Sequence, residues 1–393
     1  MIHSIEKVKS ILNELENYII SESYKGYDPF DGLMSPIFKL PILKSNKLMR
    51  FGFQQLFRRI PFNLRVLFAI DKGTNPVTLG LAVQAFTYLK QVFEEKESFY
   101  QQQIEYCLDK LIELKPKNYS GACWGYDFDW QGRYANITAY TPTIVATGII
   151  TNGLFEYYKT TNDKKAKELI ISAARFVLND LNKTYENDTY CVSYSPNDKQ
   201  MVFNASIKGA RLLAQAYTIT NNIKYLDEAE LIVKFIANNQ NSDGSWYYSK
   251  GDARKWVDNF HTAYVLDSLR EFINLSGYNK YNECLNNGIE FYTNNLFTEE
   301  GYPKYYSNSL YPIDATETAQ TILTITKFNY IEKAAVVVDF AINNLYSNKG
   351  YFYYQKHKRF TNKISFMRWS NAYMLAALSF FLMKSELKEN IFD

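Results

Sequence analysis

The chain has 393 residues, of which 47% are hydrophobic and 22% are charged, as in folded globular proteins, so disorder of the whole chain is excluded. Lysine and arginine (44) nearly balance the acidic residues (41), and no basic run of the kind that follows nucleic-acid phosphates occurs, so a nucleic-acid partner is not expected. The four scattered cysteines form no CxxC pair and there are only three histidines, so we expect neither a disulfide framework nor a metal site. No phosphate-binding loop or dinucleotide fingerprint is present, and we expect no cofactor.

The ends of the chain give no sign of a membrane segment. The N-terminal residues carry acids and lysines through an amphipathic pattern, which is not that of a signal peptide. The most apolar stretch, AYMLAALSFFLM near the C-terminus, is too short to span a bilayer. We therefore expect a cytoplasmic protein with no transmembrane segment.

Two kinds of helix are predicted to alternate along the chain. An amphipathic helix over residues 3–20 comes first, and the long segment 21–74 is expected to form a loop or short helix over one end of the fold. Six helices rich in small residues then begin near residues 75, 141, 202, 258, 312 and 367. More charged amphipathic helices lie between them, so the sequence predicts six inner and six outer helices.

The repeat is regular enough to predict a closed architecture. Successive inner helices begin 54 to 66 residues apart, and each helix pair can bury its apolar face only against the next pair. The alternative is an open solenoid, which needs polar capping repeats at its ends, and no atypical terminal repeat is present. We expect an all-α protein, an (α/α)6 toroid, with one domain over residues 1–393 and a long insertion at about 21–74.

Aromatic segments precede five of the six inner helices. In these segments a Gly is followed by alternating aromatic residues, a pattern that favours short strands, β-hairpins or loops. The segments are GACWGYDFDWQGRY, TYCVSYSPND, GSWYYSKGDARKW, GYPKYYSNSLY and GYFYYQKHKRF. All five should emerge at the same end of the toroid, which predicts an aromatic-lined mouth around the N-termini of the inner helices.

Two acids occupy equivalent positions at the starts of adjacent inner helices. Matching Asp258 of KWVDNFHTA to Asp314 of YPIDATETAQ places His261 and Glu317 together, three residues further along each helix. Aromatic neighbours could raise the pKa of such a carboxyl towards the range used in general acid catalysis. The alternative is that both acids are ordinary helix caps.

A third acidic position lies in the segment WGYDFDW. Asp127 and Asp129 alternate with aromatic residues and so share one face of a predicted strand. Asp127 is a candidate acid/base group at the same mouth, or alternatively the end of a turn. Farther along the chain, Arg368 beside Trp369 could bind a sugar acid, phosphate or carboxylate, or could equally stack at the edge of the core.

Two resemblances follow from these motifs. The six-hairpin arrangement resembles the (α/α)6 toroids of the six-hairpin glycosidase superfamily, and KWVDNFHTA is similar to the Trp-x-Asp helix start of unsaturated glucuronyl and rhamnogalacturonyl hydrolases. That likeness implies that Asp258 is an acid/base group. More broadly, YDPFDGL, WGYDFDWQGR, TPTIVATG, YPIDATETAQ and RWSNAYM resemble toroid proteins found with bacterial capsular and exopolysaccharide biosynthesis genes. This second resemblance implies a role in surface-glycan metabolism.

The terpenoid cyclase toroids give a competing interpretation. Residues 240–246, QNSDGSW, fit their Gln-x3-Gly-x-Trp repeat, and residues 127–130, DFDW, are similar to the cyclase DxDD motif. Trp130 replaces the last Asp of that motif, and the Gln/Trp element occurs only once, which favours a structural clamp from a helix end to an aromatic turn. A noncatalytic glycan-binding or assembly protein would use the same aromatic residues as stacking platforms.

The leading hypothesis is a carbohydrate-active enzyme of bacterial surface polysaccharide biosynthesis or processing, associated with the biosynthesis machinery and acting on an oligosaccharide or polysaccharide precursor. Hydrolysis, elimination and epimerisation stay open, because all three use paired acid/base groups. The candidate catalytic residues are Asp127, Asp258 and Asp314. The candidate substrate-binding residues are Trp124, Tyr126, Asp129, Trp130, Arg133, Trp246, Trp256, His261, Tyr311, Glu317, Arg368 and Trp369.

Overall fold

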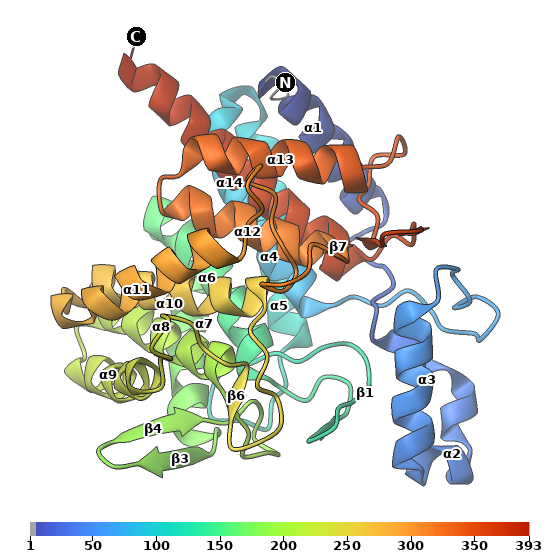
Figure 1. Cartoon of the computed structure of the whole chain (residues 1–393), viewed down its shortest axis with the longest axis horizontal. Helices are drawn as coiled ribbons and strands as arrows, with labels where there is room; N and C mark the ends of the chain where they lie inside the picture. Colours follow the sequence, from blue (N-terminus) through green and yellow to red (C-terminus); the bar gives the residue numbers. More distant parts are fainter. Residues whose placement is uncertain (1–4, 393) are drawn as a thin grey trace.

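Twelve long helices alternate between an inner and an outer ring in the computed structural model, which describes residues 5–392 and the side chains of residues 5–387 (Figure 1). The inner helices are α4 (Pro76–Val92), α6 (Ile144–Thr161), α8 (Phe203–Thr220), α10 (Asn259–Ser276), α12 (Ala315–Lys327) and α14 (Tyr373–Phe392). The outer helices are α1 (Ile5–Ser21), α5 (Glu97–Leu114), α7 (Lys164–Asn179), α9 (Ile223–Asn238), α11 (Asn282–Asn295) and α13 (Ile331–Leu345).

The inner helices form a closed ring. Each contacts the next in chain order, and α14 contacts α4, so the last repeat packs against the first. The N-terminal helix α1 packs against α14 and thereby completes the outer ring. One continuous apolar core takes in residues of all twelve helices. The predicted (α/α)6 toroid is confirmed.

Small residues explain why the inner helices can approach so closely. A Cβ added at Gly80 of α4 would lie 2.7 Å from the Cα of Ile150 on α6, which no side chain could tolerate without displacing a helix. The outer helices are instead amphipathic: α7 buries Leu169, Ile170 and Ala173 and exposes Lys164 and Lys165. The two helix types therefore differ because one is surrounded by protein and the other borders solvent.

The inner helices begin close to the expected residues, and their caps account for this. Asn75, Thr143, Asp258 and Asp314 each accept a hydrogen bond from a backbone N–H of the first turn. The last inner helix begins differently, through a π-helical turn, η5 (Met367–Ala372), that leads into α14. Short 3₁₀ turns η3 (Glu94–Lys96) and η4 (Asn279–Tyr281) precede α5 and α11.

Short antiparallel strands lie within or beside the aromatic segments. Their bounds are β1 (Trp130–Gln131), β2 (Asn136–Ile137), β3 (Lys183–Glu186), β4 (Thr189–Val192), β5 (Met201–Val202), β6 (Ser249–Lys250), β7 (Ile313–Asp314), β8 (Gln355–Lys356) and β9 (Thr361–Asn362). β1 with β2, β3 with β4, and β8 with β9 form the expected local hairpins. β6 instead pairs with β5 of the preceding repeat, and β7 pairs with β8, so some pairs join neighbouring repeats.

The insertion between α1 and α4 forms a helical hairpin beside the mouth. It contains η1 (Asp31–Met34), η2 (Pro36–Lys39), α2 (Pro41–Ser45) and α3 (Lys47–Arg59), which project from the toroid in Figure 1. Gln54 Oε1 accepts a hydrogen bond from the Gln131 backbone N–H at 2.9 Å, and a buried Arg65–Asp31 ion pair of 2.7 Å fixes the return path of the chain. Among residues 5–392 no helix is long and apolar enough to cross a membrane.

Candidate functional site

A cavity of about 390 Å³ opens where the N-terminal ends of the inner helices meet. Residues at the starts of α6, α8, α10, α12 and η5 line it, together with the loops before them and helix α3 of the insertion. Its aromatic wall consists of Phe30, Phe51, Tyr126, Phe128, Trp130, Tyr134, Tyr194, Tyr248, Trp256, Phe260, Tyr264, Tyr305, Tyr306, Trp369 and Tyr373. An aromatic-lined mouth therefore lies at the predicted end of the toroid.

Asp258 and His261 form a hydrogen-bonded pair in the cavity wall. Asp258 Oδ1 accepts from the backbone N–H of His261 at 2.9 Å, which caps α10, while Oδ2 lies 2.6 Å from His261 Nδ1. The Trp256 indole N–H also donates to Oδ2, at 3.1 Å. The Asp258 side chain is 3% exposed and that of His261 is 23% exposed. The histidine ring therefore has the freer access to the cavity, and the carboxylate holds it in place.

The hydrogen bond at Nδ1 also selects a tautomer. The Asp258 carboxylate can only accept hydrogen bonds, and it already accepts from the His261 backbone N–H and the Trp256 indole. Its contact with His261 Nδ1 therefore needs a proton on Nδ1 of the neutral ring. His261 Nε2 is then an acceptor, and no described residue donates to it. The ring is wedged against Phe260, at 4.0 Å between centroids, and against the edge of Tyr248, at 4.6 Å. This packing restricts the imidazole to one orientation.

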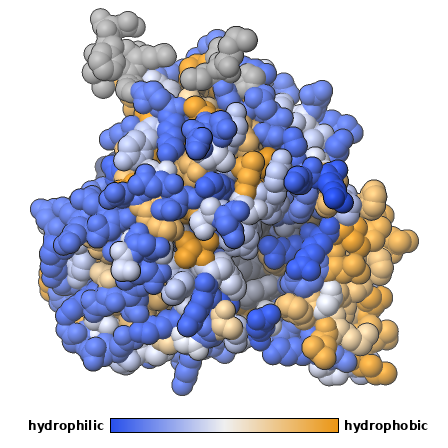
Figure 2. Space-filling view, viewed as in Figure 1, coloured by the Kyte–Doolittle hydropathy of each residue, from blue (hydrophilic) through white to orange (hydrophobic). Residues whose placement is uncertain are grey.

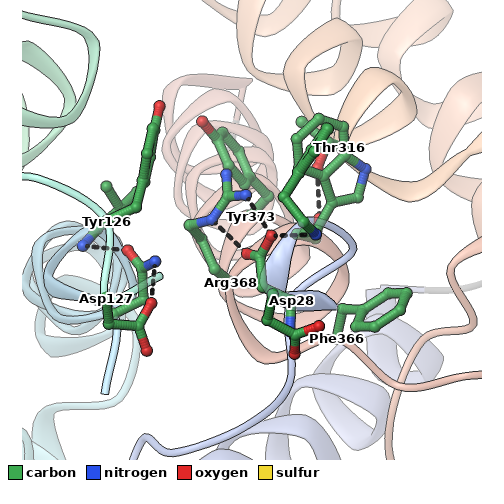
Figure 3. A network of polar contacts seen from close by, with 12 residues as sticks. Asp28, Tyr126, Asp127, Thr316, Phe366, Arg368 and Tyr373 are labelled. Carbon is green, nitrogen blue, oxygen red and sulfur yellow. Dashed lines mark hydrogen bonds and ion pairs between the residues drawn. The ribbon is translucent and has the colours of Figure 1, made fainter. Parts of the chain in front are cut away.

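Arg368 occupies another part of the wall and is already paired. Its Nε donates to Asp28 Oδ2 at 2.7 Å and one terminal nitrogen donates to Asp28 Oδ1 at 2.9 Å, a two-point contact in which the guanidinium faces the carboxylate (Figure 3). Burial lowers the pKa of a guanidinium, but the adjacent carboxylate raises that of Arg368 above its usual value. The guanidinium lies 5.0 Å from the ring centroids of both Tyr126 and Trp369. Arg368 therefore anchors the aromatic wall as a fixed cation.

Two tyrosines extend this polar part of the wall. The Tyr264 hydroxyl donates to that of Tyr373 at 2.8 Å, and both residues line the cavity. Burial raises the pKa of Tyr373 to about 12, so its hydroxyl keeps its proton at neutral pH. These hydroxyl groups are suited to hydrogen bonding with sugar hydroxyls.

In the segment WGYDFDW, of which only Trp130 belongs to a strand, aromatic and acidic side chains alternate as predicted, but the acids face away from the cavity. Tyr126 and Phe128 stack at 5.4 Å and line the cavity, whereas the Asp127 carboxylate extends in the opposite direction from the Tyr126 ring (Figure 3). Asp127 accepts from Asn75 Nδ2 at 2.6 Å, and Asp129 accepts from the Ala139 N–H at 3.0 Å. Burial raises the pKa of Asp127 to about 7, and the nearby Asp28 adds to this shift. The expectation that Asp127 and Asp129 face the mouth is corrected, because the aromatic side chains that alternate with them line the cavity instead.

Asp314 and Glu317 lie behind the wall. Asp314 is 0% exposed and accepts from two backbone N–H groups, from Gln355 Nε2 at 2.6 Å and from the Trp369 indole N–H at 3.0 Å. Burial raises its pKa, although these donors oppose the shift. Burial raises the pKa of Glu317 well above its usual value, and the neighbouring Asp314 adds to that effect. Asp314 is therefore a helix cap that anchors Trp369, which corrects the expectation that it meets substrate at the mouth.

Three aromatic candidates lie outside the cavity. The Trp124 indole donates to the Leu111 carbonyl at 2.8 Å and that of Trp246 to the Ile236 carbonyl at 3.0 Å, so each buried ring ties a segment to the end of an outer helix. Gln240 Nε2 donates to the Gly244 and Cys284 carbonyls, both at 2.9 Å, in the structural clamp predicted for QNSDGSW. Tyr311 is partly buried and is not part of the cavity lining.

Eight of the predicted residues do meet at the cavity: Tyr126, Trp130, Arg133, Trp256, Asp258, His261, Arg368 and Trp369. Several other lining residues were not predicted, among them Arg58, Asn204 and Tyr264. Asn204 lies in the first turn of α8, two residues after the cap residue Val202, and the equivalent residues Phe260 and Thr316 also line the cavity, so aligning the inner-helix starts could have revealed it. Arg58 comes from the insertion, which has no counterpart in the repeat. In the described part of the chain, no three His, Cys, Asp or Glu side chains form a group that could hold a metal ion.

No protein-family model matches the chain, and no curated protein matches its sequence. Its fold is similar to that of cellobiose 2-epimerase from Bacillus thermoamylovorans, with a TM-score of 0.64 and 12% identity over 97% of this chain and 99% of that one. A glycoside hydrolase family 76 mannosidase from Bacteroides thetaiotaomicron matches with a TM-score of 0.62 and 12% identity, over 97% and 100% of the two chains. A possible member of the GH105 family from Salmonella enterica matches with a TM-score of 0.62 and 12% identity, over 97% and 95%. The expected resemblance to six-hairpin glycosidase-like toroids is thus confirmed for the fold.

Proposed function

We propose that the chain is a carbohydrate-active enzyme that moves a proton at the carbon beside a sugar carbonyl, as in epimerisation or isomerisation. The observation that carries this proposal is the Asp258–His261 pair, 2.6 Å apart, in the wall of an aromatic cavity. Neutral histidine is the side chain best suited to accept a carbon-bound proton near neutral pH, provided that it is oriented. Asp258 provides that orientation, so its role changes from the predicted acid/base group to a positioning group.

The proposed step needs a base and a group that stabilises negative charge. His261 Nε2 accepts the proton from the carbon next to the carbonyl, and the electron pair of that C–H bond moves onto the carbonyl oxygen as an enolate forms. Arg58 and Arg133 line the same cavity and form no ion pair with a described residue, and Arg58, the less exposed of the two, is the cation that we assign to that oxygen. If the enolate turns in the cavity, return of the proton from His261 to the other face of the same carbon gives the epimer. Return to the former carbonyl carbon, with the proton of the neighbouring hydroxyl passing to the former carbonyl oxygen, gives the isomer.

The arrangement favours proton transfer over glycoside hydrolysis. Most glycosidases place two carboxyl groups on opposite sides of the scissile bond. Among the cavity-lining residues only Asp258 carries a carboxylate, and that carboxylate is engaged by His261 and Trp256. The cyclase alternative loses support for a related reason, because Asp127 and Asp129 do not line the cavity. The likeness to a cellobiose 2-epimerase fold supports a sugar substrate.

The substrate we propose is a reducing-end sugar from a bacterial surface polysaccharide or its precursor, used in association with the biosynthesis machinery. The resemblance of YDPFDGL, WGYDFDWQGR and RWSNAYM to proteins of such gene clusters supports this context. Trp130, Tyr134 and Trp256 give the cavity flat apolar surfaces of the kind on which sugar rings stack.

Solvent-deuterium exchange tests the proposal. Reducing mono- and disaccharides are incubated with the protein in D₂O and followed by NMR and mass spectrometry. Wild type should incorporate deuterium at the carbon beside the carbonyl and form an epimer or isomer, and His261→Asn should lower the rate by about 10² or more. Trp246→Phe, a buried change outside the cavity, is the matched control and should keep the rate. Cleavage of a glycosidic bond, or binding without exchange, would contradict the proposal and favour a hydrolase or a glycan-binding platform respectively.

A further inference from the structure

The insertion carries the most exposed apolar side chains of the described molecule. Ile42, Leu48, Phe62, Val66 and Leu67 are 73% to 81% exposed, whereas the most exposed large apolar residue outside the insertion is Tyr185 at 68%. Figure 2 shows hydrophobic side chains gathered on one side of the molecule, over the place of the insertion in Figure 1. We call residues 36–67 the hairpin patch. An exposed apolar surface of this kind indicates a docking site.

The charged residues of the hairpin patch are all cationic. Between residues 32 and 70 the sequence has seven lysines and arginines and no acidic residue, although the whole chain is nearly neutral. Arg50 and Arg65 are buried in ion pairs with Asp129 and Asp31. Lys39, Lys44 and Arg59 are exposed, and none forms an ion pair with a described residue. The exposed charge of the hairpin patch is therefore positive and available to a partner.

We propose that the hairpin patch binds the surface of an anionic lipid bilayer. Exposed apolar side chains interleaved with lysine and arginine are the pattern by which short helices lie in the interface of a membrane, with the apolar groups among the acyl chains and the cations at the headgroups. Only a surface that is both anionic and apolar beneath its charges satisfies both features of the patch. A second copy of this chain would bring the cations of one patch against those of the other.

The position of the hairpin patch beside the cavity gives this contact a consequence. Phe51, Gln55 and Arg58 of α3 line the cavity on one side of the helix, while Leu48 and Leu56 are exposed. The same helix thus faces both the cavity and the proposed membrane surface. Binding there holds the mouth close to the headgroups, where sugars carried on a lipid are found. The docking surface itself does not depend on the proposed chemistry.

Vesicle binding tests this inference separately from activity. The 393-residue chain is sedimented with vesicles of phosphatidylcholine alone and with vesicles of equimolar phosphatidylcholine and phosphatidylglycerol. Binding should require phosphatidylglycerol and weaken as salt is added, because exposed charges are screened. The triple variant Lys39→Gln/Lys44→Gln/Arg59→Gln should bind roughly 100-fold more weakly, since each cation near an anionic surface contributes about a fivefold factor. Ile42→Ser/Leu48→Ser should bind at least roughly tenfold more weakly, because less apolar surface leaves water.

Matched controls exclude general effects of charge and exposure. Lys164→Gln removes an exposed lysine on α7, and Tyr185→Ser removes the most exposed large apolar residue outside the insertion, so both should bind vesicles as wild type does. All of these changes are on exposed side chains, and circular dichroism and melting curves confirm that the variants fold. Equal binding to both vesicle types, no binding at low salt, or a dimer in solution that Ile42→Ser/Leu48→Ser dissociates would overturn the proposal. If the wild-type protein binds vesicles but catalyses no deuterium exchange, only the proposed reaction is contradicted.

Discussion

Helices α10 and α12 both begin with an aspartate cap, but the two caps lie in different environments. Asp258 and Asp314 each cap a helix, and each accepts a hydrogen bond from a tryptophan indole, Trp256 for the first and Trp369 for the second. Asp258 lines the cavity and holds His261, whereas Asp314 is sealed by Gln355 and Trp369. The carboxylate caps the helix in both places, and its packing partners decide whether it also serves a site.

The largest expected effect separates the two caps by activity. Asp258→Asn should keep the cap, because an amide oxygen can still accept from the backbone. It should weaken the hydrogen bond to His261 Nδ1 that favours the Nδ1-protonated tautomer. We expect turnover to fall by about 10²-fold, with substrate affinity retained, as measured by the deuterium-exchange rate and by calorimetry. Asp314→Asn is the matched variant and should change turnover by much less. Equal losses of turnover in the two variants would mean that the caps are functionally alike.

The second prediction separates the caps by stability. Asp314→Ala leaves the indole of Trp369 and the amide of Gln355 without their buried acceptor and removes a helix cap, so the free energy of unfolding should fall by about 2–3 kcal/mol. Urea denaturation followed by fluorescence and circular dichroism measures this change. Asp258→Ala, at the cap that borders the cavity, should lower the free energy of unfolding by less, because water in the cavity can reach the groups left behind. A larger decrease in the free energy of unfolding for Asp258→Ala would show that the hydrogen bonds of Asp258 contribute more to stability than the buried ones of Asp314.

The third prediction uses pH to examine the acid that turns away from the cavity. The pKa of Asp127 is raised to about 7 in the folded chain by burial, compared with about 3.9 when unfolded. A group raised in this way stabilises the fold most below about pH 4, and the contribution is lost as the pH rises through about 7. The unfolding free energy of wild type relative to Asp127→Asn should therefore fall by at least about 1 kcal/mol between about pH 4 and about pH 8. Other titrating groups are common to both proteins and cancel, so parallel curves would show that the Asp127 pKa is not raised.

The smallest expected effect concerns Trp256, whose indole donates to Asp258. Trp256 is 39% exposed in the cavity wall, so Trp256→Ala should weaken sugar binding by about 1 kcal/mol through lost stacking surface. Calorimetric titration with the exchange-competent sugar measures the dissociation constant. Trp246→Phe changes a buried indole that does not line the cavity and should leave that constant unchanged. A weaker affinity in Trp246→Phe alone would place the sugar elsewhere.

The location of the cavity could be predicted from the sequence, but only some of the residues that line it. Alternation in WGYDFDW showed that Tyr126 and Trp130 share one face and Asp127 and Asp129 the other, yet two-residue periodicity cannot say which face points inward. The Trp-x-Asp segment identified Asp258 and placed His261 one turn later, but not their mutual hydrogen bond. Arg58 could not be found, because the insertion has no repeat partner from which its position could be inferred.

The sequence by itself determined the six inner and six outer helices, the caps that begin them and the end of the toroid at which the aromatic segments emerge, because periodicity, small residues and capping are local properties. Only the tertiary structure decided that Asp258 borders the cavity and Asp314 lies behind its wall, that His261 meets the cavity, and that the insertion brings Arg58 to one side of α3 while exposing Leu48 on another. These outcomes depend on contacts between residues far apart in the chain, such as Trp369 with Asp314 and Gln54 with Gln131. Such contacts are set by how the packed repeats close, and no local pattern encodes them.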